Sequence, residues 1–68
     1  MKPFKLVTKL GTGGMQVGIH WLGVLPRVGD HIIGEDSTLW RIDAVAHYSF
    51  LREHQFEGPV GELAVTKA

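Results

Sequence analysis

The sequence predicts an all-β domain, a small barrel of about five short antiparallel strands. Its composition favours strands, with seven Val, four Ile and four Thr among 68 residues, together with nine Gly, three Pro and no Asn. Apolar and polar residues alternate in short segments that are separated by turn-forming clusters. A chain of this length is expected to form one domain over residues 1–68. Closing its sheet into a barrel would protect the sheet's edges.

The first strand is expected over residues 2–10, which alternate with period two. One parity is largely apolar and is expected to face inward: Phe4, Leu6, Thr8 and Leu10. The other parity carries two lysines and is expected to face outward: Lys5, Val7 and Lys9. Outward lysines suit a strand at the edge of a sheet.

The second strand begins at residue 15, after a glycine-rich hairpin connection at residues 11–14, and is expected to end at Pro26. Residues 22–25 are apolar on both parities, so their facing stays open. The strand's other large apolar residues share one parity and are expected to face the core: Met15, Val17, Ile19 and Trp21. The other parity is expected to face outward: Gln16, Gly18 and His20. A glycine at position 18, inside the strand, indicates a bulge or a close backbone approach.

Turns and one long strand fill the middle of the chain. Residues 26–30 predict a turn in which Gly29 takes a positive φ, and residues 34–37 predict a polar hairpin tip after a short strand at 31–33. The longest strand is expected over residues 38–49. Its large residues do not stay in phase, so a bulge near Asp43 is expected to turn them all inward: Trp40, Ile42 and Val45.

Residues 50–59 remain open between a loop, a single helical turn and the ends of two strands. The last strand, residues 62–67, is expected to turn Leu63 and Val65 inward. The expected core therefore draws on every strand: Leu6, Val17, Ile19, Val28, Ile32, Trp40, Ile42, Val45 and Val65. Phe4 and Trp21 are expected to join it, because so small a barrel needs bulky residues to fill itself.

The turn at residues 26–30 and the strands around it resemble small SH3-like β-barrel proteins of bacteria and phage. The shared pattern is Pro-x-x-Gly-Asp-x-Ile, a hairpin, and then aromatic-x-Ile-x-x-Val-x-His, carried here by Pro26–Ile32 and Trp40–His47. The likeness covers residues 25–47, about a third of the chain. It implies an SH3-like fold but no particular chemistry, because such barrels host many unrelated roles.

The net charge of zero hides an uneven distribution along the chain. Residues 1–29 carry four basic residues and no acid, whereas residues 30–68 carry seven acids and three basic residues. The favoured interpretation is that opposite charges meet across the sheet. A basic face that meets an acidic partner, or a second copy of the chain, is the alternative.

No constellation of residues points to catalysis. The four histidines are separated by 11, 16 and 7 residues, which matches no helical or zinc-finger pair: His20, His31, His47 and His54. A zinc site formed by three of these histidines is a weaker interpretation than histidine side chains that face solvent. Neither Ser37 nor Ser49 lies in a nucleophile elbow, and the glycine-rich residues 11–14 lack the Lys and helix of a phosphate cradle. We therefore expect no enzyme, no cofactor and no metal site.

The chain has no cysteine, no run of about 20 apolar residues and no signal-peptide pattern at its start. These features favour a cytoplasmic protein without a membrane partner. They carry no information about the process in which the protein acts.

The expected function is a non-enzymatic protein-interaction module, with another protein or a second copy of the chain as partner. Its candidate contact residues lie in or near the last part of the chain: Arg41, His47, Tyr48, Phe50 and Phe56. The alternative is a nucleic-acid-binding barrel that uses the four lysines Lys2, Lys5, Lys9 and Lys67, which would cluster if the first and last strands pair. A pI near neutrality makes nucleic acid the weaker partner.

Overall fold

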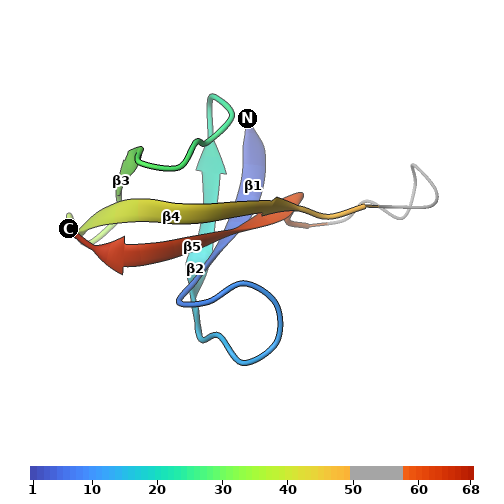
Figure 1. The fold of residues 1–68 in the computed structure, drawn as a ribbon. Coiled ribbons are helices and arrows are strands. Elements are labelled where there is room, and N and C mark those ends of the chain that lie inside the picture. The colour runs from blue at the N-terminus through green and yellow to red at the C-terminus, as the bar shows by residue number, and fades with distance from the viewer. Residues whose placement is uncertain (50–57) are drawn as a thin grey trace.

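The computed structural model describes residues 1–49 and 58–68, in which five strands form one sheet. The strands are β1 (Lys2–Val7), β2 (Gln16–Leu22), β3 (His31–Ile33), β4 (Leu39–His47) and β5 (Gly61–Lys67). Their order in the sheet is β2-β1-β5-β4-β3, and the sheet curls into a half-barrel (Figure 1). The all-β class is confirmed, since the described residues contain no helix.

The pairing of the first and last strands departs from the expected antiparallel sheet. β1 and β5 run parallel, with Lys5 opposite Glu62 and Val7 opposite Ala64, while the other neighbouring strands are antiparallel. β1 is therefore an interior strand and not the expected edge, because β5 occupies the side that β2 leaves open. Figure 1 shows the β1–β2 pair crossing the β4–β5 pair, which gives the sheet its curl.

One hydrophobic core lies on the inner face of the curled sheet. Its buried members come from four strands: Phe4, Leu6, Ile32, Ile42, Leu63 and Val65. Four half-buried residues pack against it: Leu22, Trp40, Val45 and Val60. The expected inward positions are confirmed for Phe4, Leu6, Ile42, Leu63 and Val65. On β1 the prediction was wrong at two positions: Val7, expected outward, is 4% exposed and lies opposite buried Ala64 in the sheet interior, and Thr8, expected inward, is exposed after the strand ends. Five apolar residues that were expected to face the core are exposed instead, and for these the prediction was wrong: Met15, Val17, Ile19, Trp21 and Val28.

A bulge in β4 brings its large side chains to one face, as the sequence predicted. Ile42 lies opposite Val65 and Ala44 lies opposite Ala64, so Asp43 is an extra residue without a partner in β5. The extra residue shifts the strand's alternation by one position. Trp40 and Ile42 before the bulge therefore face the core together with residues after it.

The turn at residues 26–30 also has the expected geometry. Gly29 has a φ of 94°, in the left-handed region that favours glycine. The Asp30 carboxylate accepts a hydrogen bond from the Arg27 backbone N–H (3.0 Å), and the Gly29 N–H donates to the carbonyl oxygen of Ile42 (2.8 Å). These bonds hold the turn against β4 and position the short strand β3.

The alternation of β2 is the reverse of the sequence-based expectation. Phe4 and Leu6 of β1, both buried, lie opposite His20 and Gly18 of β2. Cross-strand partners share a face, so His20 and Gly18 face inward. Trp21 consequently faces outward and keeps 63% of its surface exposed.

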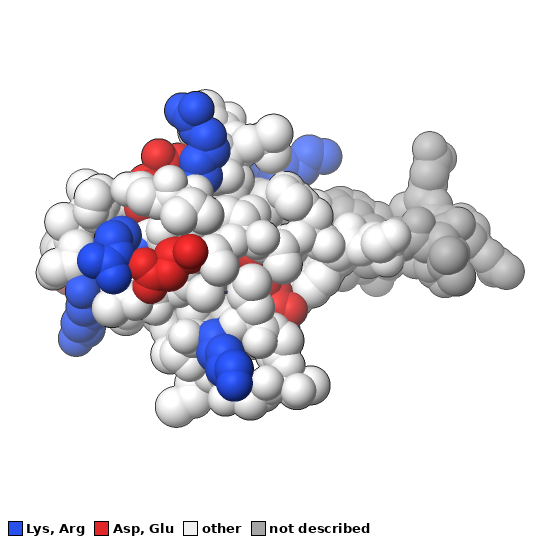
Figure 2. Space-filling view, in the orientation of Figure 1, with Lys and Arg blue, Asp and Glu red and all other residues white. Residues whose placement is uncertain are grey.

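Charged side chains of both signs are scattered over the face shown in Figure 2, where blue and red atoms adjoin one another. Lys5 of the basic half lies opposite Glu62 of the acidic half, and Arg41 is paired with Asp43 in the same strand. The Lys5–Glu62 pair is the kind of cross-sheet meeting of charges that the sequence favoured.

Candidate functional site

Strand β2 forms one edge of the sheet and carries exposed apolar side chains. Val17, Ile19 and Trp21 keep 38%, 48% and 63% of their surfaces exposed, and we call these three residues the β2 patch. Among the strands of residues 1–49 and 58–68, β1 alone lies next to β2, so within the described residues one side of the β2 backbone has no neighbouring strand. Unpaired backbone beside exposed apolar side chains is a template for another strand.

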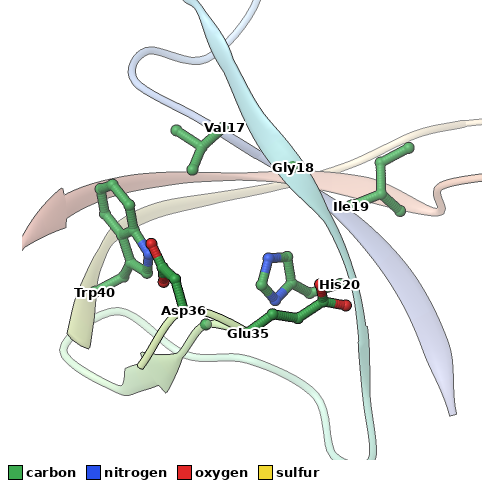
Figure 3. A pocket seen from close by; sticks show the side chains of 8 residues that line it. Val17, Gly18, Ile19, His20, Glu35, Asp36 and Trp40 are labelled. Atoms are coloured by element: carbon green, nitrogen blue, oxygen red, sulfur yellow. The ribbon is translucent and has the colours of Figure 1, made fainter. Parts of the chain in front are cut away.

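A groove lies beside this edge on the inner side of the half-barrel. It has a volume of about 370 Å³ and is lined by β2 residues 17–20, by residues 34–36 after β3, and by Trp40. Figure 3 shows Val17 on the side of β2 that is nearer to Trp40 and Ile19 on the other side of the strand, with Asp36 beside Trp40 and Glu35 beside His20. The groove is therefore open between the β2 edge and the β3–β4 hairpin.

Gly34 and Asp36 shape the hairpin side of the groove. A Cβ on Gly34 would lie 3.2 Å from Asp36 Oδ1 and 3.4 Å from Trp40 Nε1, so glycine lets these two atoms approach the same point. Asp36 Oδ1 accepts a hydrogen bond from the Thr38 backbone N–H (3.0 Å), and this bond is the main cause that lowers the pKa of Asp36. The carboxylate is thereby kept ionised and fixed to its own turn.

A second cavity lies at the other end of the β1–β2 pair. It has a volume of about 430 Å³ and is lined by Met1, Lys2, Phe4 and residues 22–25. Val24 and Leu25 beside it are exposed, so apolar surface continues past the end of β2.

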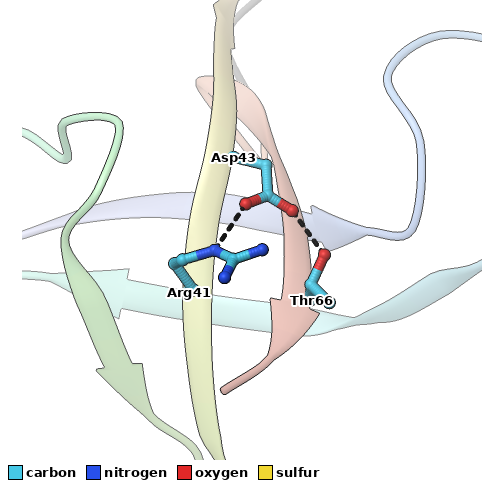
Figure 4. A network of polar contacts seen from close by, with 3 residues as sticks. All are labelled: Arg41, Asp43 and Thr66. Carbon is cyan, nitrogen blue, oxygen red and sulfur yellow. Dashed lines mark hydrogen bonds and ion pairs between the residues drawn. The ribbon is translucent and has the colours of Figure 1, made fainter.

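Arg41, one of the expected contact residues, is engaged in a surface network on the outer side of β4. Its Nε donates to Asp43 Oδ1 (2.8 Å), and Thr66 Oγ1 donates to Asp43 Oδ2 (Figure 4). The Thr66 bond first, and the Arg41 bond and charge second, lower the pKa of Asp43. These two hydrogen bonds satisfy the carboxylate of Asp43, the bulged residue whose backbone has no register partner in β5.

Two other expected contact residues, His47 and Tyr48, lie at the opposite end of β4 from Arg41. The Tyr48 hydroxyl donates to Glu62 Oε2 (2.9 Å), and burial followed by this bond raises the pKa of Tyr48. His47 is exposed at the end of β4, where its ring lies 6.0 Å from that of Phe4 in an edge-to-face arrangement. Phe50 and Phe56 lie outside the described residues.

The four lysines of the nucleic-acid alternative lie on different parts of the fold. Lys2 and Lys5 belong to β1, Lys9 follows that strand, and Lys67 ends β5. The first and last strands do pair, but they run parallel, so Lys2 begins one strand and Lys67 ends the other. The lysine cluster that was expected from this pairing therefore does not follow from it.

Metal-ligating residues do not converge within the described part of the chain. No group of three or more His, Cys, Asp or Glu side chains there could hold a metal ion. Among residues 1–49 and 58–68, no helix is long and apolar enough to cross a membrane.

The β2 patch was visible in the sequence as an alternating set, but it was assigned to the wrong face. One signal could have located it: residues 10–26 contain no Lys, Arg, Asp or Glu. A solvated strand in a small domain normally carries charge on its outer face. An uncharged strand with apolar residues on one parity is therefore compatible with an outer face that another chain covers.

Comparison of this chain with protein-family models, with characterised proteins and with solved structures finds no match.

Proposed function

We propose that this protein is a non-enzymatic interaction module that associates with a second copy of itself through the edge of β2. The observation that carries the proposal is the position of the β2 patch on an unprotected sheet edge. Edge strands are ordinarily shielded by charged residues, by proline, by β-bulges or by being very short. β2 is seven residues long and contains neither a proline nor a Lys, Arg, Asp or Glu, and its bulge at Val17 leaves residues 18–22 in regular pairing with β1.

The opposite edge of the sheet provides a contrast within the same molecule. β3 has only three residues, and so it offers little backbone to an added strand. Because the β3 edge is short and the β2 edge is not, the arrangement favours a specific contact at β2 over non-specific aggregation.

A second copy is the partner that the charges favour. Residues 10–26 carry no formal charge, so pairing two copies along β2 brings no like charges together within this stretch. A two-fold contact also needs only one surface that complements itself. The β2 patch meets this need, since apolar side chains can pack against their own kind.

The proposed barrel class is SH3-like. The turn at residues 26–30, the hairpin tip at 34–37 and the bulged strand β4 support this assignment, because they lie within the residues that carry the resemblance. The parallel β1–β5 pair departs from the antiparallel sheet that the resemblance implies.

The direct test is the molar mass as a function of concentration, measured by light scattering or sedimentation equilibrium. We expect the wild-type mass to rise with concentration and the Trp21→Lys variant to remain a monomer. Val28→Lys is the matched control, because Val28 is equally exposed (66% against 63%) but lies outside β2. A strictly monomeric wild type, or equal loss in both variants, would refute the proposal.

Binding of nucleic acid is the alternative function, and the same samples test it. If lysines neutralised three phosphates of a single strand, the logarithm of the affinity would fall with the logarithm of salt concentration with a slope of about −2. We expect no appreciable oligonucleotide binding at physiological salt, because seven acids on so small a body oppose it.

A further inference from the structure

We infer that two copies of the chain join their sheets by antiparallel pairing of residues 18–22 of β2, with the two-fold axis passing beside His20. The inference rests on the proposed function and adds the direction and the register in which the two β2 strands pair. It follows from the direction of backbone groups, from one bulge and from the faces of four side chains.

The direction of the β2 backbone groups is fixed through β1. The Pro3 carbonyl oxygen accepts a hydrogen bond from the Val60 N–H (2.8 Å), so Pro3 directs its backbone toward the β5 side. Successive residues of a strand direct their N–H and C=O groups to opposite sides. Phe4 therefore directs its groups toward β2, where it lies opposite His20. His20 in turn is bonded toward β1, and its neighbours Ile19 and Trp21 direct their N–H and C=O groups to the open edge.

A bulge limits the usable edge at its beginning. Leu6 lies opposite Gly18 and Val7 lies opposite Gln16, so Val17 is an extra residue in β2. Bulges disrupt regular pairing, and regular pairing is thus available only from Gly18 to the end of the strand at Leu22.

Ile19 and Trp21 direct their backbone N–H and C=O groups to the open edge, and only one two-fold register pairs both of them with regular strand residues. An axis beside His20 pairs Ile19 of each copy with Trp21 of the other, and each pair exchanges two backbone hydrogen bonds. An axis beside Ile19 would pair Trp21 with the bulged residue Val17. An axis beside Trp21 would pair Ile19 with Gly23, which lies beyond the strand.

Side chains on both faces suit this register. On the outer face, Ile19 of each copy contacts Trp21 of the other, an aliphatic–aromatic cross-strand pair that stabilises antiparallel sheets. On the inner face, Gly18 lies opposite Leu22, so a small residue meets a large one, and His20 lies opposite its own copy. The groove of about 370 Å³ lies beside Ile19 and His20, between β2 and residues 34–36 of the same chain (Figure 3).

Cysteine cross-linking tests the register, because the chain contains no cysteine of its own. Residues opposite each other at a non-hydrogen-bonded position have Cα atoms about 4.5 Å apart, within the range for a disulfide. We expect His20→Cys to form a covalent dimer at least about ten times faster than Gln16→Cys under mild oxidation. Residue 16 of one copy would lie about 26 Å along the strand from residue 16 of the other.

A pair of substitutions at position 19 tests whether the backbone takes part. Proline removes the outward-directed N–H of Ile19 without removing a bond to β1, so Ile19→Pro should fold and remain monomeric. Ile19→Ala loses the side chain but keeps the N–H, and we expect it to retain part of the association. Far-UV circular dichroism of each variant checks the fold.

The outcomes separate this inference from the proposed function. Association of the wild type with equal cross-linking of His20→Cys and Gln16→Cys would overturn the register and leave self-association standing. Equal weakening by Ile19→Pro and Ile19→Ala, in folded variants, would overturn strand pairing. A wild type that stays monomeric would refute both. If His20→Cys does not fold, Ile19→Pro and Ile19→Ala still decide whether the β2 backbone pairs with a second copy.

Discussion

Lys5 lies directly opposite Ile19 in the β1–β2 pair, on the face of the sheet that also carries Trp21. Lys5 belongs to an interior strand and is half-buried, whereas Ile19 belongs to the edge strand and is 48% exposed. A lysine would ordinarily protect an edge, and an isoleucine would ordinarily fill a core. The reversal leaves the edge apolar and is the basis for proposing that a second chain covers it.

Truncation of Ile42 tests the position of the core. Ile42 is 1% exposed and lies within the buried cluster, so Ile42→Ala should reduce the free energy of unfolding by about 2–5 kcal/mol. Urea denaturation followed by circular dichroism measures the change. Val28→Ala is the control and should change it by no more than about 0.5 kcal/mol, because Val28 is exposed. Similar losses in the free energy of unfolding of both variants would contradict the position of Ile42 in the core.

Gly29 should tolerate no β-branched residue. Its φ of 94° is strained for any side chain, so Gly29→Val should cost about 1–3 kcal/mol of stability. Arg27→Ala, two residues away, should be nearly silent, because the turn uses the backbone N–H of Arg27 and not its exposed side chain. Thermal unfolding of the two variants measures the difference in stability. A Gly29→Val variant that melts at the wild-type temperature would contradict the need for glycine at this position.

Gly61 is restricted by close packing and not by its φ. A Cβ at this position would lie 2.3 Å from the carbonyl oxygen of Ala46 in β4 and 3.2 Å from Phe4 Cε2. Gly61→Ala should therefore destabilise the fold by about 1–3 kcal/mol, the usual cost of overpacking. Gly23→Ala is the matched control, since nothing lies within 4 Å of its Cβ position. Equal melting temperatures for the two variants would contradict this pairing of β4 with β5.

The Asp43 network should make stability depend on acid pH. Hydrogen bonds from Thr66 and Arg41 lower the pKa of Asp43 in the folded chain below the usual value of an aspartate. A lowered folded-state pKa stabilises the fold above the unfolded-state pKa, and this contribution is lost as the pH falls through the folded-state value. The stability difference between wild type and Asp43→Asn should thus shrink as the pH is lowered below about 4. A difference that stays constant from pH 6 to pH 2 would show that the charge of Asp43 does not contribute.

Local sequence signals predicted the strands, the turns and one bulge correctly. The Gly29 turn and the Asp43 bulge were predictable because each depends on neighbouring residues alone: a positive φ in one case, a break in alternation in the other. Most buried residues of β1, β4 and β5 followed from period-two patterning for the same reason, but Val7, which the pattern placed outward, is 4% exposed.

The inward face of β2 and the parallel pairing of β1 with β5 could not be predicted in this way. Alternation separates two faces of a strand but does not show which face the rest of the chain covers. That choice depends on the order of the five described strands, in which β2 lies at one end, beside β1. The site was missed with it, because Ile19 and Trp21 were assigned to the core that their chemistry suits.

Amide hydrogen exchange of β2, followed by NMR at several protein concentrations, tests the central claim most directly. In the monomer, the amides of Gly18 and His20 should be protected by their bonds to β1, whereas those of Ile19 and Trp21 should exchange as open amides. We predict that the protection of Ile19 and Trp21 rises with concentration in parallel with the molar mass. Rapid exchange of both amides in samples that are demonstrably dimeric would contradict the pairing of β2 with a second copy.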